Sequence, residues 1–187
     1  MSEVVLVRHG ETEWSRSGQH TGITDLPLTE DGEAQARSVV ERLAGREFAL
    51  VLSSPMQRAR RTAELAGYGQ RAEPDADLRE RDYGDYEGLT TKEIRKTIPG
   101  WDVWRDEMVN GETLAQVGAR ADRVIERALA ADGDTLVFAH SHLLRTLGAR
   151  WIGLGPEGGG KLVLGTSAIC VLGFGRERRV LKRWNWT

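Results

Sequence analysis

The chain has almost no cysteine and no long apolar run. Cys170 is the only cysteine among 187 residues, so neither an internal disulfide nor a zinc site built from several cysteines can form. No stretch approaches the roughly 18 consecutive apolar residues of a membrane-spanning helix. The apolar run at residues 4–7 is also shorter than the roughly 7–15 residues of a signal-peptide core. These absences predict a cytoplasmic protein without a membrane partner.

An excess of either charge is also missing. The 26 basic and 28 acidic residues give a net charge of −2. Proteins that bind nucleic acids non-specifically are normally basic, so no nucleic-acid partner is expected. At roughly 150 residues per domain the length corresponds to little more than one domain, and residues 1–187 are interpreted as a single domain.

Apolar runs alternate with helical patterns along most of the chain, which indicates a layered α/β fold with a largely parallel sheet. The middle of the chain is irregular and is interpreted as a lid-like insertion at about 73–110, with a short helix at 91–97. Polar and turn residues occupy 8–27. Strands are predicted at 4–7, 48–52, 136–139, 168–172 and 180–186, and helices at 29–44, 58–66, 117–129 and 143–154.

Two histidines, His9 and His140, each follow a predicted buried strand. In open α/β sheets, ligands bind beyond the carboxyl ends of the strands, so both imidazoles are expected to face one crevice. Arg8 adjoins the first histidine, and Arg58 opens the helix after a third strand. Guanidinium groups match phosphate oxygens, and the helix N-terminus at 54–58 adds unpaired N–H groups. A histidine in such a pocket can attack phosphorus as a nucleophile.

Five segments occur in order along the chain: LVRHGETEW at 6–14, TGITDLPLT at 21–29, SSPMQRA at 53–59, LRERDYGDYEG at 78–88 and VFAH at 137–140. Together they resemble the signature of the histidine phosphatase superfamily, the phosphoglycerate-mutase-like proteins. The resemblance implies a three-layer α/β sandwich with a mostly parallel central sheet flanked by helices. It favours the phosphatase branch, which includes broad-specificity acid phosphatases and sedoheptulose-bisphosphatase-like sugar phosphatases, because Ser15 and Ile23 stand where mutases usually carry other residues.

The same resemblance implies a role for each matching residue. His9 is similar to the nucleophile that becomes phosphohistidine, and Glu80 to the acid that protonates the leaving oxygen and then activates water. His140 is implied to act with them. The resemblance also implies a set of phosphate-binding residues, and it implies neither a metal nor a cofactor. That set is Arg8, Arg58, Thr21, Gly22 and Ser15.

Spacing alone leaves two of these assignments open. Arg60 and Arg61 lie beside Arg58, and only the motif alignment selects among the three. Asp82 and Glu87 are alternatives to the predicted acid at position 80. Two other functions also remain open: a phosphoglycerate mutase that uses the same site, and a non-catalytic module that recognises phosphate. A small phosphorylated substrate is expected in each case.

The remaining motifs are interpreted as structural or have no assigned role. His140 and His142 would share one face of a strand, but a zinc site needs three or four ligands. Residues 155–161 have the spacing of a phosphate-binding loop, yet Leu162 replaces its Ser or Thr and 162–164 has a strand pattern, so a mobile surface loop is predicted. The C-terminal basic residues and tryptophans are interpreted as a strand with a charged outer face and tryptophans that pack inward. Ser141 replaces a glycine common in the family, and Tyr83, Trp101 or Trp104 are expected to contact the leaving group.

Overall fold

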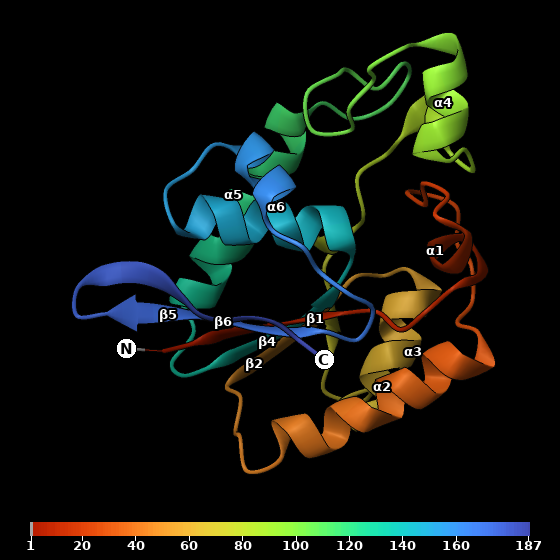
Figure 1. Cartoon of the computed structure of the whole chain (residues 1–187). Helices are drawn as coiled ribbons and strands as arrows, with labels where there is room; N and C mark the ends of the chain where they lie inside the picture. The colour runs from red at the N-terminus through yellow and green to blue at the C-terminus, as the bar shows by residue number, and fades with distance from the viewer. Residues whose placement is uncertain (1) are drawn as a thin grey trace.

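The structure is a computed structural model that describes residues 2–187; Met1, the first residue of the predicted domain, lies outside them (Figure 1). The described chain forms a six-stranded sheet in the order β3-β2-β4-β1-β5-β6. Strands β3, β2, β4 and β1 are parallel, β5 runs antiparallel to β1, and β6 antiparallel to β5. The strands are β1 (Val4–Arg8), β2 (Leu50–Ser53), β3 (Glu73–Pro74), β4 (Thr135–Ala139), β5 (Ile169–Gly175) and β6 (Arg178–Trp186).

Helices cover both faces of the sheet, which confirms the predicted three-layer sandwich (Figure 1). Helices α2 (Glu30–Leu43) and α3 (Gln57–Leu65) pack on one face, and α5 (Leu114–Leu129) and α6 (Ser141–Trp151) on the other. Strand β1 contributes Val5 and Val7 to the first core, and Val4 and Leu6 to the second. Because successive side chains of a strand point to opposite faces, a strand covered on both sides has a continuous apolar run.

The sequence prediction missed one short helix, α1 (Glu13–Ser17), within the segment assigned to turns. A capping box stabilises the N-terminus of this helix: Ser15 N–H donates to the Thr12 hydroxyl, and Thr12 N–H donates to the Ser15 hydroxyl. Nearby, the chain after β1 approaches the first turn of α2 so closely that a Cβ on either Gly10 or Gly32 would overlap backbone atoms. This contact fixes the chain directly after the predicted nucleophile.

The irregular segment at 73–110 has an apolar cluster of its own. It contains the 3-10 helices η1 (Ala76–Leu78) and η2 (Gly84–Tyr86), and α4 (Thr91–Thr97), which confirms the predicted short helix. The buried Arg81 side chain holds the segment together, since its Nε donates to the Glu112 carbonyl at 2.9 Å and its Nη1 to the Val103 carbonyl at 2.6 Å. The cluster consists of Tyr83, Tyr86, Ile94, Trp101 and Met108.

The structure corrects two interpretations of the sequence. Residues 162–164 are not a strand, and the preceding glycine-rich stretch is not a loose loop but a 3-10 helix, η3 (Pro156–Lys161), with Gly158 and Gly159 buried. Strand β4 ends at Ala139, so His140 is the N-cap of α6 and His142 lies within this helix rather than on a strand. In a helix, residues two apart do not share a face, which removes the geometric basis for a metal-binding pair.

The C-terminal strand has the predicted charged outer face. Trp184 packs against the core under α6, and Trp186 packs against the core under α2 and α3. Among residues 2–187, no helix has both the length and the apolar character needed to cross a membrane.

Candidate active site

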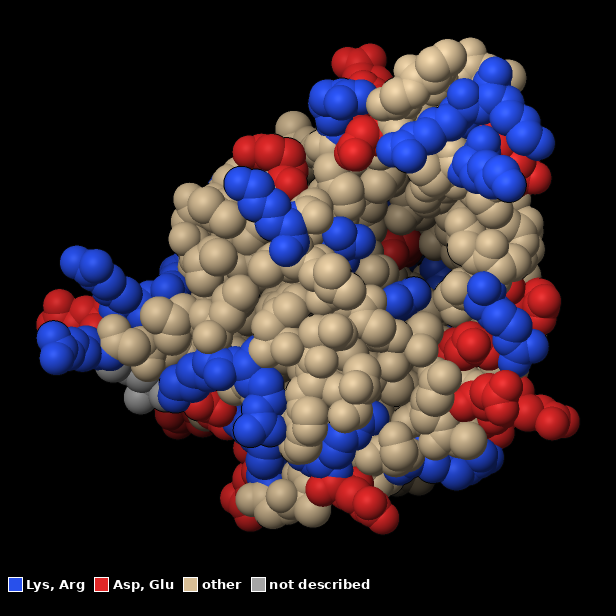
Figure 2. Space-filling model, viewed as in Figure 1, with Lys and Arg blue, Asp and Glu red and all other residues tan. Residues whose placement is uncertain are grey.

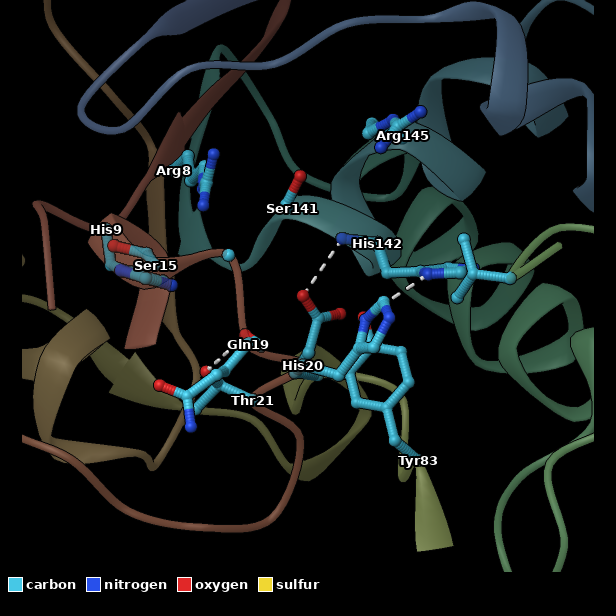
Figure 3. Close-up of a pocket in the computed structure, with 13 residues that line it drawn as sticks. Arg8, His9, Ser15, Gln19, His20, Thr21, Tyr83, Ser141, His142 and Arg145 are labelled. Carbon is cyan, nitrogen blue, oxygen red and sulfur yellow. Dashed lines mark hydrogen bonds between the residues drawn. The ribbon is translucent and has the colours of Figure 1, made fainter. Parts of the chain in front are cut away.

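A cavity of about 190 Å³ opens where β1 and β4 end. Figure 2 shows the hollow on this face, with basic and acidic atoms inside it. Its wall combines the end of β1, the segment around α1, the irregular segment and the first turns of α6 (Figure 3). The lining residues are Arg8, His9, Ser15, Gly18, Gln19, His20, Thr21, Glu80, Tyr83, Val103, Ser141, His142 and Arg145.

His9 is held so that one ring nitrogen is available for chemistry. Its backbone N–H donates to the Ala139 carbonyl at 3.0 Å, which joins the end of β1 to the end of β4. The ring Nδ1 lies 2.7 Å from the Gly10 carbonyl oxygen. Because a carbonyl can only accept, Nδ1 carries the proton and Nε2 keeps its lone pair. Burial, together with the charges of Arg58 and Arg8, holds the pKa of His9 well below its usual range, so the ring is neutral.

His140 lies behind His9, with ring centroids 5.2 Å apart. The Arg58 Nε donates to His140 Nδ1 at 3.1 Å, so this nitrogen is the acceptor. The proton therefore resides on Nε2, which donates to the Ser54 hydroxyl at 2.7 Å. Burial and the Arg58 charge lower the pKa of His140 well below its usual range. The two histidines thus present opposite tautomers in one buried cluster.

Arg58 is completely buried and connects His140 to the loop that follows α1. Neither Arg58 nor His140 lines the cavity itself. Its Nη1 donates to the Thr24 carbonyl at 2.9 Å, and its Nη2 to the Gly22 carbonyl at 2.8 Å. Of the three adjacent arginines, only this one is buried: Arg61 pairs with Glu33 on the surface. The position selected by the motif is therefore the one placed next to His9 and His140.

Arg8 supplies a second guanidinium at the cavity wall. Its Nη1 donates to the Leu164 carbonyl at 2.7 Å, while its buried Nε has no partner among residues 2–187. Burial lowers the pKa of Arg8, and the Glu80 carboxylate opposes this effect. A half-buried cation whose Nε–H has no partner in the described chain can bind an anionic ligand.

Glu80 lies across the cavity at the N-terminus of α6. Its Oε1 accepts hydrogen bonds from the backbone N–H groups of Arg81 at 3.0 Å and Leu143 at 2.9 Å, and its Oε2 accepts one from His142 at 2.9 Å. The N-cap residue provides no side-chain cap, so this carboxylate takes that place. The alternative acids Asp82 and Glu87 do not line this cavity.

The other three predicted phosphate-binding residues differ in position. Ser15 and Thr21 line the cavity. Gly22 does not: its N–H donates to the Glu87 carboxylate at 2.5 Å, and its carbonyl accepts from Arg58. Gly22 therefore supports the buried arginine, and its contact with phosphate stays a prediction.

Several lining residues were not identified from the sequence. His20 and Gln19 come from the loop after α1, and no spacing pattern marks them. Arg145 lies one turn after His142 on α6, so the three-residue spacing could have indicated that both face the cavity. Of the expected leaving-group contacts, Tyr83 lines the cavity, whereas Trp101 and Trp104 do not.

The lowered pKa of His20 makes the free energy of unfolding depend on pH. Burial and Arg81 lower the pKa of His20 from 6.5 to about 4. Between these values the unfolded chain binds more protons than the folded one, so stability is present above pH 6.5 and is lost as the pH falls. We expect His20→Gln to reduce this slope between pH 6.5 and 5 in urea unfolding. An unchanged slope in the variant would contradict this assignment.

Comparison with known proteins agrees with this geometry. Residues 4–187 match the histidine phosphatase superfamily (branch 1). The chain is 42% identical over 186 residues to sedoheptulose 1,7-bisphosphatase of Saccharomyces cerevisiae, covering 82% of this chain and 68% of the relative. It is 40% identical over 175 residues to an acid phosphatase of Mycobacterium tuberculosis, covering 91% and 86%.

A solved structure shares the whole fold. It is a mycobacterial glucosyl-3-phosphoglycerate phosphatase in complex with VO3, which superposes with a TM-score of 0.88 at 28% identity and covers 100% of both chains. The strand order, the two histidines at neighbouring strand ends and these matches agree with one another. The chain belongs to the histidine phosphatase superfamily.

Proposed function

We propose that this chain hydrolyses phosphomonoesters of small metabolites through a phosphohistidine formed on His9, without a metal ion. One observation carries the proposal: a neutral imidazole with a free Nε2 lone pair lines one cavity together with the Arg8 cation and the Glu80 carboxylate. The cavity volume of about 190 Å³ is below the roughly 300–1,000 Å³ of sites for drug-sized ligands. A sugar phosphate or a similar small ester fits this space.

In the first step, His9 Nε2 attacks the phosphorus atom and the bond to the leaving oxygen breaks. Glu80, in its protonated form, gives its proton to that oxygen, and the alcohol departs. Arg8 and Arg58 stabilise the charge on the phosphoryl oxygens, the task that Mg²⁺ performs in other phosphoryl-transfer enzymes. His140 keeps its Nε2–H bonded to the Ser54 hydroxyl, so this proton is not available to the substrate.

In the second step, the Glu80 carboxylate takes a proton from water. The hydroxide formed attacks the phosphohistidine, the P–N bond breaks, and inorganic phosphate leaves. The pair His9 and Glu80 returns to its starting protonation. A mutase would instead return the phosphoryl group to the bound alcohol, so access of water to this intermediate separates the two functions.

Phosphate release in excess EDTA tests the proposal. The substrates are p-nitrophenyl phosphate, phosphoglycerates, sugar mono- and bisphosphates and nucleotides. We expect turnover to remain within about twofold of the value without chelator, because the cationic side chains act in place of a metal. Loss of turnover that added Mg²⁺ restores would refute the metal-independent mechanism. Conversion of 3-phosphoglycerate to 2-phosphoglycerate with a bisphosphoglycerate primer, without phosphate release, would favour the mutase.

A further inference from the structure

A chain of contacts links the surface of the molecule to the cavity wall. The Tyr83 hydroxyl lies 3.4 Å from His142 Nδ1, and both residues line the cavity (Figure 3). The His142 ring stacks on the Trp104 indole, with centroids 3.7 Å apart and planes at 23°. The indole in turn lies against η3 and under the Arg145 guanidinium, whose Cζ is 4.5 Å from the ring centroid. The buried imidazole has no role in the chemical steps above.

The glycines of η3 make room for the indole. A Cβ on Gly159 would lie 2.5 Å from a Trp104 ring atom, and a Cβ on Gly160 would lie 2.9 Å from its Cγ. The Gly159 carbonyl also accepts a hydrogen bond from Arg145 Nε at 3.1 Å. These residues belong to the stretch that has the spacing of a phosphate-binding loop. Here the absence of side chains at Gly159 and Gly160 allows the Trp104 indole to pack against η3.

His142 has two separate connections to the site. Its backbone N–H donates to Glu80 Oε2 at 2.9 Å, and its imidazole meets the Tyr83 hydroxyl. Replacing the imidazole with another aromatic ring therefore leaves the backbone contact with the catalytic acid and the stacking on Trp104 in place, and removes the contact with the tyrosine hydroxyl. Burial and the Glu80 charge raise the pKa of Tyr83 well above its usual range, so its hydroxyl stays protonated.

We propose that Trp104, seated on Gly159 and Gly160, is a positioning residue that holds His142 against Tyr83, so that the Tyr83 hydroxyl is aimed at a hydroxyl group of the departing alcohol. A hydroxyl group both donates and accepts, so it matches the phenol oxygen in either orientation of the phenolic hydrogen. The inference rests on the proposed phosphatase function. It assigns to that function substrates whose leaving group carries hydroxyl groups, such as sugars.

The test compares two substrates of the same enzyme. One is the sugar phosphate with the highest kcat/KM among the substrates tested for phosphate release. The other is p-nitrophenyl phosphate, whose leaving group has no further hydroxyl. We expect His142→Phe, which keeps an aromatic ring for stacking but cannot bond the tyrosine, to lower kcat/KM for the sugar phosphate about 5- to 10-fold, mainly through KM. Hydrolysis of p-nitrophenyl phosphate changes by less than about twofold, because that leaving group makes no such contact.

Tyr83→Phe should lower kcat/KM for the sugar phosphate by the same factor as His142→Phe. The double variant should show no further loss in kcat/KM, because both substitutions remove the same interaction. Trp104→Leu should also lower kcat/KM for the sugar phosphate, while Trp104→Phe, which retains stacking, restores it. The matched control is Trp186→Leu, a half-buried tryptophan that packs on the opposite face of the sheet. It should leave the ratio of the two substrates unchanged.

Each failure has a distinct meaning. If the wild-type chain hydrolyses neither substrate, the proposed phosphatase function fails. If the wild-type chain is active but His142→Phe leaves the sugar phosphate unaffected, or its loss adds fully to that of Tyr83→Phe, the link between these residues is overturned. Trp104→Leu with unchanged selectivity would overturn the positioning by Trp104. Thermal unfolding of each variant, with Trp104→Phe as the conservative substitution, separates these results from misfolding.

Discussion

His9→Ala abolishes phosphate release, with an expected loss in kcat of at least about 10⁴-fold. The free Nε2 lone pair of His9 is the only nucleophile proposed for the cavity, and the neighbouring ring at position 140 has its Nε2–H committed to Ser54. Arg8 and Arg58 are held by the Leu164, Thr24 and Gly22 carbonyls and do not depend on the imidazole. Binding of inorganic phosphate should therefore remain within about threefold while turnover disappears.

Steady-state phosphate release and calorimetric phosphate binding check this pair of outcomes. Added imidazole provides the matched control, because a free ring that enters the vacated space can accept the phosphoryl group and restore part of the rate. If the alanine variant kept wild-type turnover, the phosphohistidine mechanism would be wrong. If turnover and phosphate binding were lost together, the imidazole would serve binding rather than nucleophilic attack.

Glu80→Gln lowers kcat for sugar phosphates by about 10²- to 10⁴-fold, the usual contribution of a general acid–base group. An alkoxide is a poor leaving group that needs the proton, whereas p-nitrophenolate leaves without one. With p-nitrophenyl phosphate, the first step should therefore stay fast and the second become slow, because no carboxylate activates the water. We expect a burst of p-nitrophenol equal to the enzyme concentration and a trapped phosphohistidine.

Rapid mixing and acid-labile labelling of the protein check this result. Asp82→Asn is the matched control: within residues 2–187 its carboxylate accepts only the Gly84 N–H, at 2.8 Å, and it does not line the cavity. This variant should keep kcat within about twofold. A variant at position 80 that slowed both substrates equally and gave no burst would point to a positioning role rather than acid–base catalysis.

The residues at the strand ends were predictable because of a topological rule. Parallel strands end at one edge of a sheet, so His9 after β1 and His140 after β4 had to be neighbours once both strands were recognised. The position of Arg58 near these histidines was predictable for the same reason, because β2, which precedes it, is parallel to β4. The apolar runs that mark these strands are continuous because helices cover both faces of the sheet.

Residues from irregular segments were not predictable in this way. Glu80 was indicated only by family resemblance, since its position depends on the first turn of α6, to which it is bonded. His20 reaches the cavity from the loop after α1, which no periodic pattern describes. Arg145, in contrast, could have been inferred from its three-residue spacing to His142 on α6. The glycine-rich stretch was misread because its role is set by a distant partner, the Trp104 indole.

The two outer strands also determine how the molecule behaves at high concentration. An unpaired sheet edge can template pairing between molecules, and both edges here resist it. At one edge, β3 has only two residues, and Pro74 has no N–H to donate. At the other, β6 exposes Arg178, Arg179 and Arg183, whose positive charges would repel those of a second copy. The short strand at one edge and the basic strand at the other thus both oppose edge-to-edge pairing between copies of the chain.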